Sequence, residues 1–207
     1  MTIEKGQPWG SPARDLSLPE AATATTDAEA RAIVETARRA NEPVPPLVLL
    51  GGDLCRTVGG TGDLDHARGP DAVALPCDLG SVLLDGRQHW FVAHLVARRS
   101  WWRGRVYAAM NAQFLGRYDV APRGHPNDGA VEVLDVDPAL GVADRVKAWR
   151  RLPTGTHVPH PDITVRRLRA QQETFDPPLT VWLDGVRVGD VRNVSLRVEP
   201  DAVVVVV

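Results

Sequence analysis

The chain has 207 residues, of which 43% are hydrophobic and 24% are charged, the composition of an ordinary globular protein. Its net charge of -2 argues against a nucleic-acid partner, because such proteins usually carry a basic excess. Cys55 and Cys77 lack the spacing of a zinc site or a disulfide framework, and no apolar run approaches the roughly 18 residues of a transmembrane segment. Residues 1–30 contain no signal-peptide core, so we expect a cytoplasmic protein, with peripheral contact to a membrane left open.

The N-terminal quarter begins with an irregular segment and continues into a helix. Residues 1–24 are rich in Pro, Ser, Ala and Thr without periodicity, which predicts a mobile lead-in. Thr26 and Glu29 have the spacing of a capping box, and apolar residues then recur at helical intervals. Asn41 and Pro43 predict the end of this helix.

Strand signals dominate the remainder of the chain. Leu47–Leu50 is a short apolar run that predicts a buried strand, and from about Ala72 short strands alternate with Gly and Pro turns. Asp85-Gly86 between two apolar runs is a hairpin signal. One helix, about Leu140 to Arg151, interrupts the strands. The pattern predicts a mainly β (α+β) protein, a β-sandwich with an N-terminal helix and one inserted helix. The other predicted strands are 82–84, 90–95, 105–114, 130–136, 163–168, 179–183, 187–191, 194–198 and 202–207.

A glycine pair follows the first predicted strand and opens a helical turn. Gly51, Gly52 and Asp53 could bind a phosphate, because glycines let backbone amides approach an anion at a helix N-terminus. A Gly-Gly pair after a strand is weak evidence for such a site, and a plain strand-to-helix turn is the more common explanation.

Asp184-Gly185 stands between two β runs near the end of the chain. Asp-Gly is a strong hairpin signal, because both turn positions need positive φ. A role for Asp184 as a catalytic acid or base is the alternative.

Two tryptophans lie within a basic run, where Trp101 and Trp102 precede Arg103. Such a segment suits a lipid headgroup layer, the packing of arginine stems over indole rings, or stacking with single-stranded nucleic acid. We expect lipid or membrane contact by these three residues as one of these alternatives. The six histidines show no metal-binding spacing, so no metal site is predicted.

Several segments together resemble one family. Asn111–Val133 reads as a strand, a glycine turn, Ala-Pro, Asp-Gly and a further strand, and resembles the C-terminal domain of diacylglycerol kinase-like lipid kinases. The resemblance continues through 153–157, 181–185 and 198–200, and extends upstream to about Leu47. It implies that 71–207 form the β-rich lipid-side domain and that 25–70 are a remnant of the element beside the nucleotide.

The resemblance also locates the departures from the family pattern. The segment from Gly51 to Gly59 resembles the family's Gly-Thr-Gly-Asn-Asp-Leu-Ala-Arg-Thr-Leu-Gly element, with Leu50 and Gly52 in place of its Thr and Asn. Asp184 matches the Asp of its Asp-Gly-Glu motif, to which the family assigns the role of general base, but Val186 replaces the Glu. The family's Gly-Gly-Asp-Gly-Thr phosphate loop is not found in residues 1–46.

These departures predict a degenerate family protein without kinase activity of its own, which binds a lipid, a small ligand or a protein partner. No cofactor is then expected. One alternative is an ATP-dependent lipid kinase completed by a separate ATP-binding chain, which would need Mg2+ and ATP. Another is a structural or oligomerising β-sandwich, with a homodimer or a partner protein covering the face of the missing domain.

Overall fold

The computed structural model describes residues 9–15 and 21–207. Residues 1–8 and 16–20 of the predicted lead-in lie outside the described residues. The described parts of this segment lie against the sheet: β1 (Ser11–Pro12) pairs with β4, and β2 (Ala22–Ala24) pairs in parallel with β3.

The described residues form four α-helices and thirteen strands, and the strands dominate as predicted. The helices are α1 (Asp27–Ala40), α2 (Gly52–Thr57), α3 (Leu64–Ala67) and α4 (Val142–Arg151). The remaining strands are β3 (Leu47–Leu49), β4 (Val73–Leu84), β5 (Arg87–Phe91), β6 (His94–Arg98), β7 (Val106–Met110), β8 (Phe114–Leu115), β9 (Tyr118–Asp119), β10 (Val131–Val136), β11 (Ile163–Leu168), β12 (Ala170–Leu183) and β13 (Val186–Val206).

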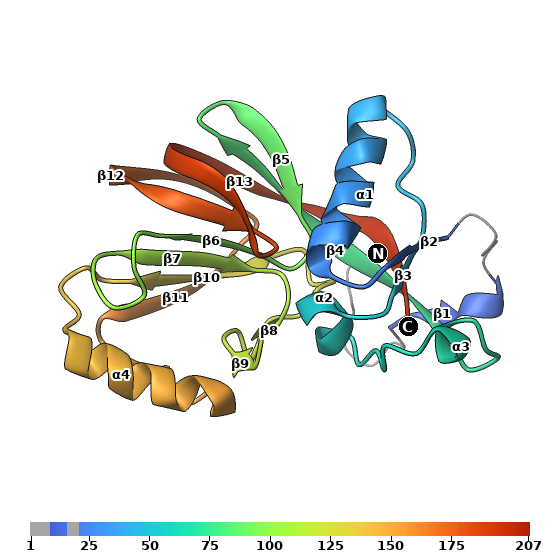
Figure 1. Cartoon of the computed structure of the whole chain (residues 1–207), viewed down its shortest axis with the longest axis horizontal. Coiled ribbons are helices and arrows are strands. Elements are labelled where there is room, and N and C mark those ends of the chain that lie inside the picture. The colour runs from blue at the N-terminus through green and yellow to red at the C-terminus, as the bar shows by residue number, and fades with distance from the viewer. Residues whose placement is uncertain (1–8, 16–20) are drawn as a thin grey trace.

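One strongly curved sheet forms the body of the molecule. Its strands follow the order β1-β4-β13-β12-β6-β7-β10-β11, and β5 pairs with β4. Apolar side chains of β4, β6, β7, β10, β12 and β13 meet in one buried cluster, so the two halves of the sheet enclose a common core. The predicted mainly β class is confirmed, and α4 packs below the β6-β7-β10 half (Figure 1).

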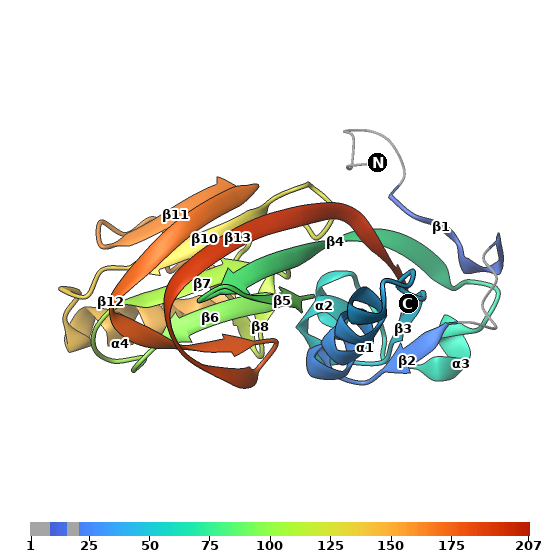
Figure 2. The same cartoon turned by 90° about the horizontal axis from the view of Figure 1, so that it is seen from above.

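The N-terminal elements form a second layer at the other end of the molecule (Figure 1). α1 begins as the capping box predicts: the Thr26 hydroxyl accepts the Glu29 N–H, while the Glu29 carboxylate accepts the amide of Thr25. Asn41 ends the helix in the left-handed conformation. β3 pairs in parallel with the last part of β13, which runs as one long arc between the two ends (Figure 2).

Several predicted strand boundaries were wrong. The predicted strand 90–95 is split between β5 and β6, because the amides of Val92 and Ala93 bond to a side chain instead of a neighbouring strand. β12 begins at Ala170, upstream of the predicted start. The three runs predicted over 187–207 are one strand, β13, with register shifts opposite β12 and β4.

Candidate functional site

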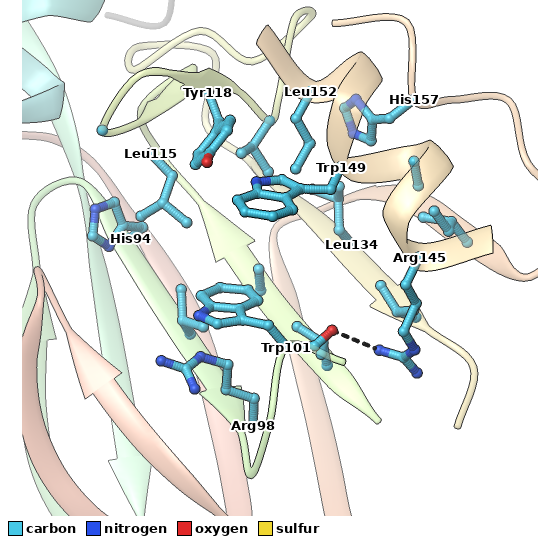
Figure 3. Close-up of a pocket in the computed structure, with 18 of the residues that line it drawn as sticks. His94, Arg98, Trp101, Leu115, Tyr118, Leu134, Arg145, Trp149, Leu152 and His157 are labelled. Carbon is cyan, nitrogen blue, oxygen red and sulfur yellow. Dashed lines mark hydrogen bonds between the residues drawn. The ribbon is translucent and has the colours of Figure 1, made fainter. Parts of the chain in front are cut away.

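An apolar pocket of about 750 Å³ lies between α4 and the sheet (Figure 3). Its floor consists of small and branched side chains of β6, β7 and β10, among them Val96, Ala108 and Leu134. Tyr118, Trp149 and Leu152 contribute to its walls. This volume falls within the range of about 300–1,000 Å³ typical of small-molecule sites, and the lining is predominantly hydrophobic and aromatic as in such sites.

Aromatic side chains stand at the mouth of this pocket. Trp101, Trp102 and Trp149 line it and are also exposed, at 44%, 37% and 39%. Trp102 meets Trp149 edge-on, with ring centroids 4.8 Å apart, so the β6–β7 loop and α4 touch through indole rings. The guanidinium of Arg98 lies over Trp101 at 4.2 Å and over Trp182 at 4.3 Å.

These observations place the predicted segment Trp101, Trp102 and Arg103 beside a pocket. The predicted packing of an arginine stem on an indole ring is present, with Arg98 as the arginine. Arg103 itself is exposed in the same loop. The expectation that the three residues contact lipid remains a prediction.

A buried arginine fixes the position of α4. The Arg145 side chain donates hydrogen bonds to the backbone carbonyls of Trp101, Gly104, Asp137 and Leu140, and is only 5% exposed. Because the guanidinium presents its donors in a rigid fork, it joins α4 to the two loops at its flank in one geometry. The mouth of the pocket is therefore held in a defined shape.

The inner end of the pocket is polar. His94, at the start of β6, lines the pocket and is 4% exposed. Its Nε2 lies 3.0 Å from the Asp53 carboxylate, which also accepts the N–H of Gly116. Burial lowers the pKa of His94, but its hydrogen bond to Asp53 and the charges of Asp184, Asp53 and Asp27 raise it above its ordinary value. The Nδ1 of His94 has no hydrogen-bond partner among the described residues.

The predicted phosphate cradle at Gly51, Gly52 and Asp53 already holds an anion, the side chain of Asp27. The two oxygens of this carboxylate accept the N–H groups of Asp53 and Leu54, at 2.6 Å and 3.1 Å. Gly52 has φ +93, and a Cβ there would lie 2.5 Å from the Asp27 carboxylate. The glycine is therefore required by the packing of Asp27 at this turn.

Asp184 is placed deep inside the protein. Its carboxylate accepts the backbone N–H groups of Val92, Ala93 and His94 at 2.9–3.0 Å, and its side chain has no exposed surface. Burial raises the pKa of Asp184 to about 6, although His94 and the three amides lower it. The predicted Asp184-Gly185 hairpin turn is confirmed, with φ 50 and 80 at the two positions. A catalytic role for Asp184 remains a prediction.

One group of side chains in the described part of the chain could hold a cation, because its ligand atoms lie within 4.8 Å of one another: Asp27, Asp53 and His94. Hydrogen bonds within the protein already account for this arrangement: amides bind both carboxylates, and His94 contacts Asp53. A phosphate with its Mg2+ does not fit here, because the Asp27 carboxylate occupies the amides that a phosphate would need. No chemical step through either group follows from this geometry.

Known structures share this architecture. The chain superimposes on a diacylglycerol kinase from Bacillus anthracis with a TM-score of 0.57 at 12% identity over 78% of this chain. Two further structures from that organism, both assigned as diacylglycerol kinases, give TM-scores of 0.60 and 0.59 at 11% and 10% identity, again over 78% of this chain. The fold is that of diacylglycerol kinases.

The diacylglycerol kinase fold confirms the resemblance predicted from the sequence at the level of architecture. This chain spans 66% of the length of the first structure and 69% of the other two. No family model and no curated protein sequence matches the chain. Among the described residues, no helix is both long and apolar enough to pass through a bilayer.

Several residues that form the pocket and its polar inner end were not predicted from the sequence. Trp149 and Arg145 belong to a helix that was predicted, but the face that meets the sheet was not. His94 and Asp27 each contact residues at least 26 positions away, and no local pattern indicates such contacts. The one available signal was the four tryptophans at 101, 102, 149 and 182, all of which line the pocket.

Proposed function

We propose that this protein binds an amphiphilic lipid, with its apolar chains in the pocket beneath α4. The observation that carries the proposal is the pocket itself: about 750 Å³ lined by apolar and aromatic side chains, open at one side between Trp101, Trp102 and Trp149. Water is bound weakly in such a cavity, whereas an apolar chain that enters it is stabilised because its surface is removed from water.

The polar group of the lipid would lie at the inner end. There the pocket reaches His94 and Gly116, beside the Asp53 carboxylate. The Nδ1 of His94 is buried and has no hydrogen-bond partner among the described residues, so a hydroxyl group that reached it would donate to it or accept from it. A neutral lipid with a free hydroxyl, such as a diacylglycerol, combines the two features. The structures that share the fold are assigned as diacylglycerol kinases, which supports this choice.

We further propose that the chain does not transfer phosphoryl groups on its own. Phosphoryl transfer depends on donors and cations that hold the phosphates. The N–H groups of Asp53 and Leu54, which follow the Gly51–Gly52 pair, donate to the Asp27 carboxylate. The Asp184 carboxylate accepts three backbone N–H groups away from solvent. Val186, at the position where the family pattern has Glu, is an exposed apolar residue that offers no metal ligand.

The test is a titration of the purified chain with dioctanoylglycerol, a soluble short-chain diacylglycerol, followed by tryptophan fluorescence. Ala108 lies on the pocket floor and is 6% exposed, so Ala108→Trp should fill the space and weaken binding at least tenfold. Ala32→Trp, on the exposed face of α1, is the matched control and should bind as the parent does. Circular dichroism must show that both variants are folded.

Two results would overturn the proposal. One is the absence of any saturable response to dioctanoylglycerol; the other is equal binding by the parent and by a folded Ala108→Trp variant. A parallel calorimetric titration with Mg-ATP addresses catalysis. Binding tighter than about 1 mM that weakens in Asp184→Asn would favour the kinase alternative over a non-catalytic protein.

A further inference from the structure

Exposed apolar side chains gather around the mouth of the pocket. Eight large hydrophobic residues are exposed in the described part of the chain, and four of them belong to the β6–β7 loop and α4. We call these four residues the tryptophan patch: Trp101, Trp102, Val142 and Trp149. The patch includes every tryptophan that is exposed among the described residues, whereas the other four are valines or a leucine spread over β4, β11 and β13. A cluster of this kind marks an interaction surface.

The patch is preorganised. Trp102 packs edge-on against Trp149, and Arg145 bonds to the carbonyls of Trp101 and Gly104 from the α4 side. Figure 3 shows Trp101 joined to Arg145 by one of these bonds, with Trp149 beside them. The β6–β7 loop and α4 therefore present their indole rings together, and a partner need not order them first.

The charge around the patch has the opposite sign to that of the whole protein. Residues 98–104 and 142–151 contain seven Lys and Arg against one Asp, a formal excess of six, whereas the chain as a whole carries -2. The single carboxylate, Asp144, is paired with Lys147 at 2.8 Å. Arg103, Arg150 and Arg151 are exposed and make no ion pair with any described residue. Basic side chains that surround exposed indole rings complement an anionic surface.

We infer that this face docks on the surface of an anionic lipid bilayer, with the tryptophan patch among the headgroups and the free arginines on the lipid phosphates. Tryptophan is favoured at the boundary between headgroups and acyl chains, and each cation near an anionic leaflet adds about 1 kcal/mol, or roughly fivefold in affinity. This inference goes beyond the proposed function: it names the surface on which the protein works, and it holds whether or not the pocket takes up a lipid.

Docking in this orientation directs the mouth of the pocket toward the membrane. Trp101, Trp102 and Trp149 belong both to the pocket wall and to the patch. A lipid could therefore pass from the leaflet into the cavity without crossing water, which would avoid the cost of hydrating its acyl chains.

The experiment measures co-sedimentation with vesicles of phosphatidylcholine alone and of phosphatidylcholine with 30 mol% phosphatidylglycerol, at about 0.05 M and 0.5 M salt. The parent protein should bind the anionic vesicles at low salt, and bind them far less at high salt or without phosphatidylglycerol. Arg103→Glu/Arg150→Glu/Arg151→Glu should lower affinity roughly hundredfold. Arg14→Glu/Arg68→Glu/Arg87→Glu, three exposed arginines elsewhere, is the matched control and should retain most of the binding.

The apolar contribution is tested separately. Trp101→Ala/Trp102→Ala should lower affinity at least tenfold, while Leu83→Ser/Val186→Ser, which removes two exposed apolar residues elsewhere, should have little effect. Should the tryptophan variant fail to fold, quenching of the parent's fluorescence by brominated lipids gives the same information without a substitution. Quenching by bromines near the headgroups is the expected result.

Three results would overturn the inference: no binding of the parent to anionic vesicles at low salt, equal losses in the test and control arginine variants, or no quenching by brominated lipids. A dimer that light scattering detects and that Trp101→Ala/Trp102→Ala dissolves, with no vesicle binding, would assign the patch to self-association instead. Ala108→Trp separates the two proposals, because it should lose dioctanoylglycerol binding and keep vesicle binding.

Discussion

Removal of the Asp27 carboxylate should destabilise the protein far more than an ordinary substitution at the start of a helix. Asp27 is the first residue of α1, but its side chain acts on α2, where it accepts two backbone N–H groups. A hydrogen bond to a charged group contributes about 1.5–3 kcal/mol, so the two bonds together contribute about 3–6 kcal/mol. Burial raises the pKa of Asp27, which shows that the carboxylate itself is costly to bury. We therefore expect Asp27→Ala to lower the free energy of unfolding by a net of about 2–4 kcal/mol.

The assay is urea unfolding at pH 7, followed by circular dichroism. Thr26→Ala is the matched control, because the Thr26 hydroxyl accepts one exposed N–H at the same helix start and its loss should cost about 1 kcal/mol. If Asp27→Ala costs no more than Thr26→Ala, the carboxylate does not hold the Gly51–Gly52 turn together. The packing of Asp27 would then no longer explain the glycine pair.

Three further predictions concern pH, a glycine and α4. Folding raises the pKa of Asp184 to about 6 and also raises the pKa of His94, so both groups bind protons more tightly in the folded state. The stability that this binding contributes is complete below the pKa values of the unfolded chain. It is lost as pH rises through the pKa values of the folded protein. Asp184 alone should account for about 2 kcal/mol between pH 4 and pH 7. Urea unfolding across this range checks this value, and Asp184→Asn should flatten the profile. A rise in stability with pH would contradict it. Gly52→Ala should lower the free energy of unfolding by more than about 2 kcal/mol, measured by thermal unfolding, because its Cβ would collide with the Asp27 carboxylate. Gly86→Ala, with φ +84 and open space around it, should cost only about 1 kcal/mol. Equal costs would rule out the collision. Arg145→Met leaves four backbone carbonyls without their donor, so the free energy of unfolding should fall by about 3 kcal/mol and the response to dioctanoylglycerol should weaken. Arg145→Lys should recover only part of each. An unchanged lipid response would show that the pocket does not depend on the Arg145 hydrogen bonds.

Local patterns predicted the elements whose cause is local. The helix start at Thr26 and the two Asp-Gly hairpins follow from side chains that act on their immediate neighbours, and the structure confirms them. Strand β13 was predicted as three strands with breaks at residues 192–193 and 199–201, the second of which contains Pro200. Pairing with β4 and β12 along almost its whole length overrides that local preference, as tertiary context commonly does.

The candidate site was less predictable, because its contacts join distant parts of the chain. Asp184 was predicted as a turn residue, but the sequence does not indicate that its carboxylate binds amides about ninety positions earlier. The glycine pair was predicted either as a cradle or as a turn, and the residue that decides between them, Asp27, lies on another helix. The basic tryptophan segment was recognised, but its partner Trp149 was not, since no sequence pattern specifies which loop a helix will meet.

The pairing of β3 bears on how the chain folds during synthesis. Leu47 and Val48 lie beside Val205 and Val206, so the inner strand of the N-terminal layer gains this neighbour only after residue 206 has been made. Until then α1 and β3 have part of their apolar surface uncovered on the ribosome, although they were translated first. The two ends of the molecule therefore cannot mature one after the other, and the N-terminal layer must wait for β13.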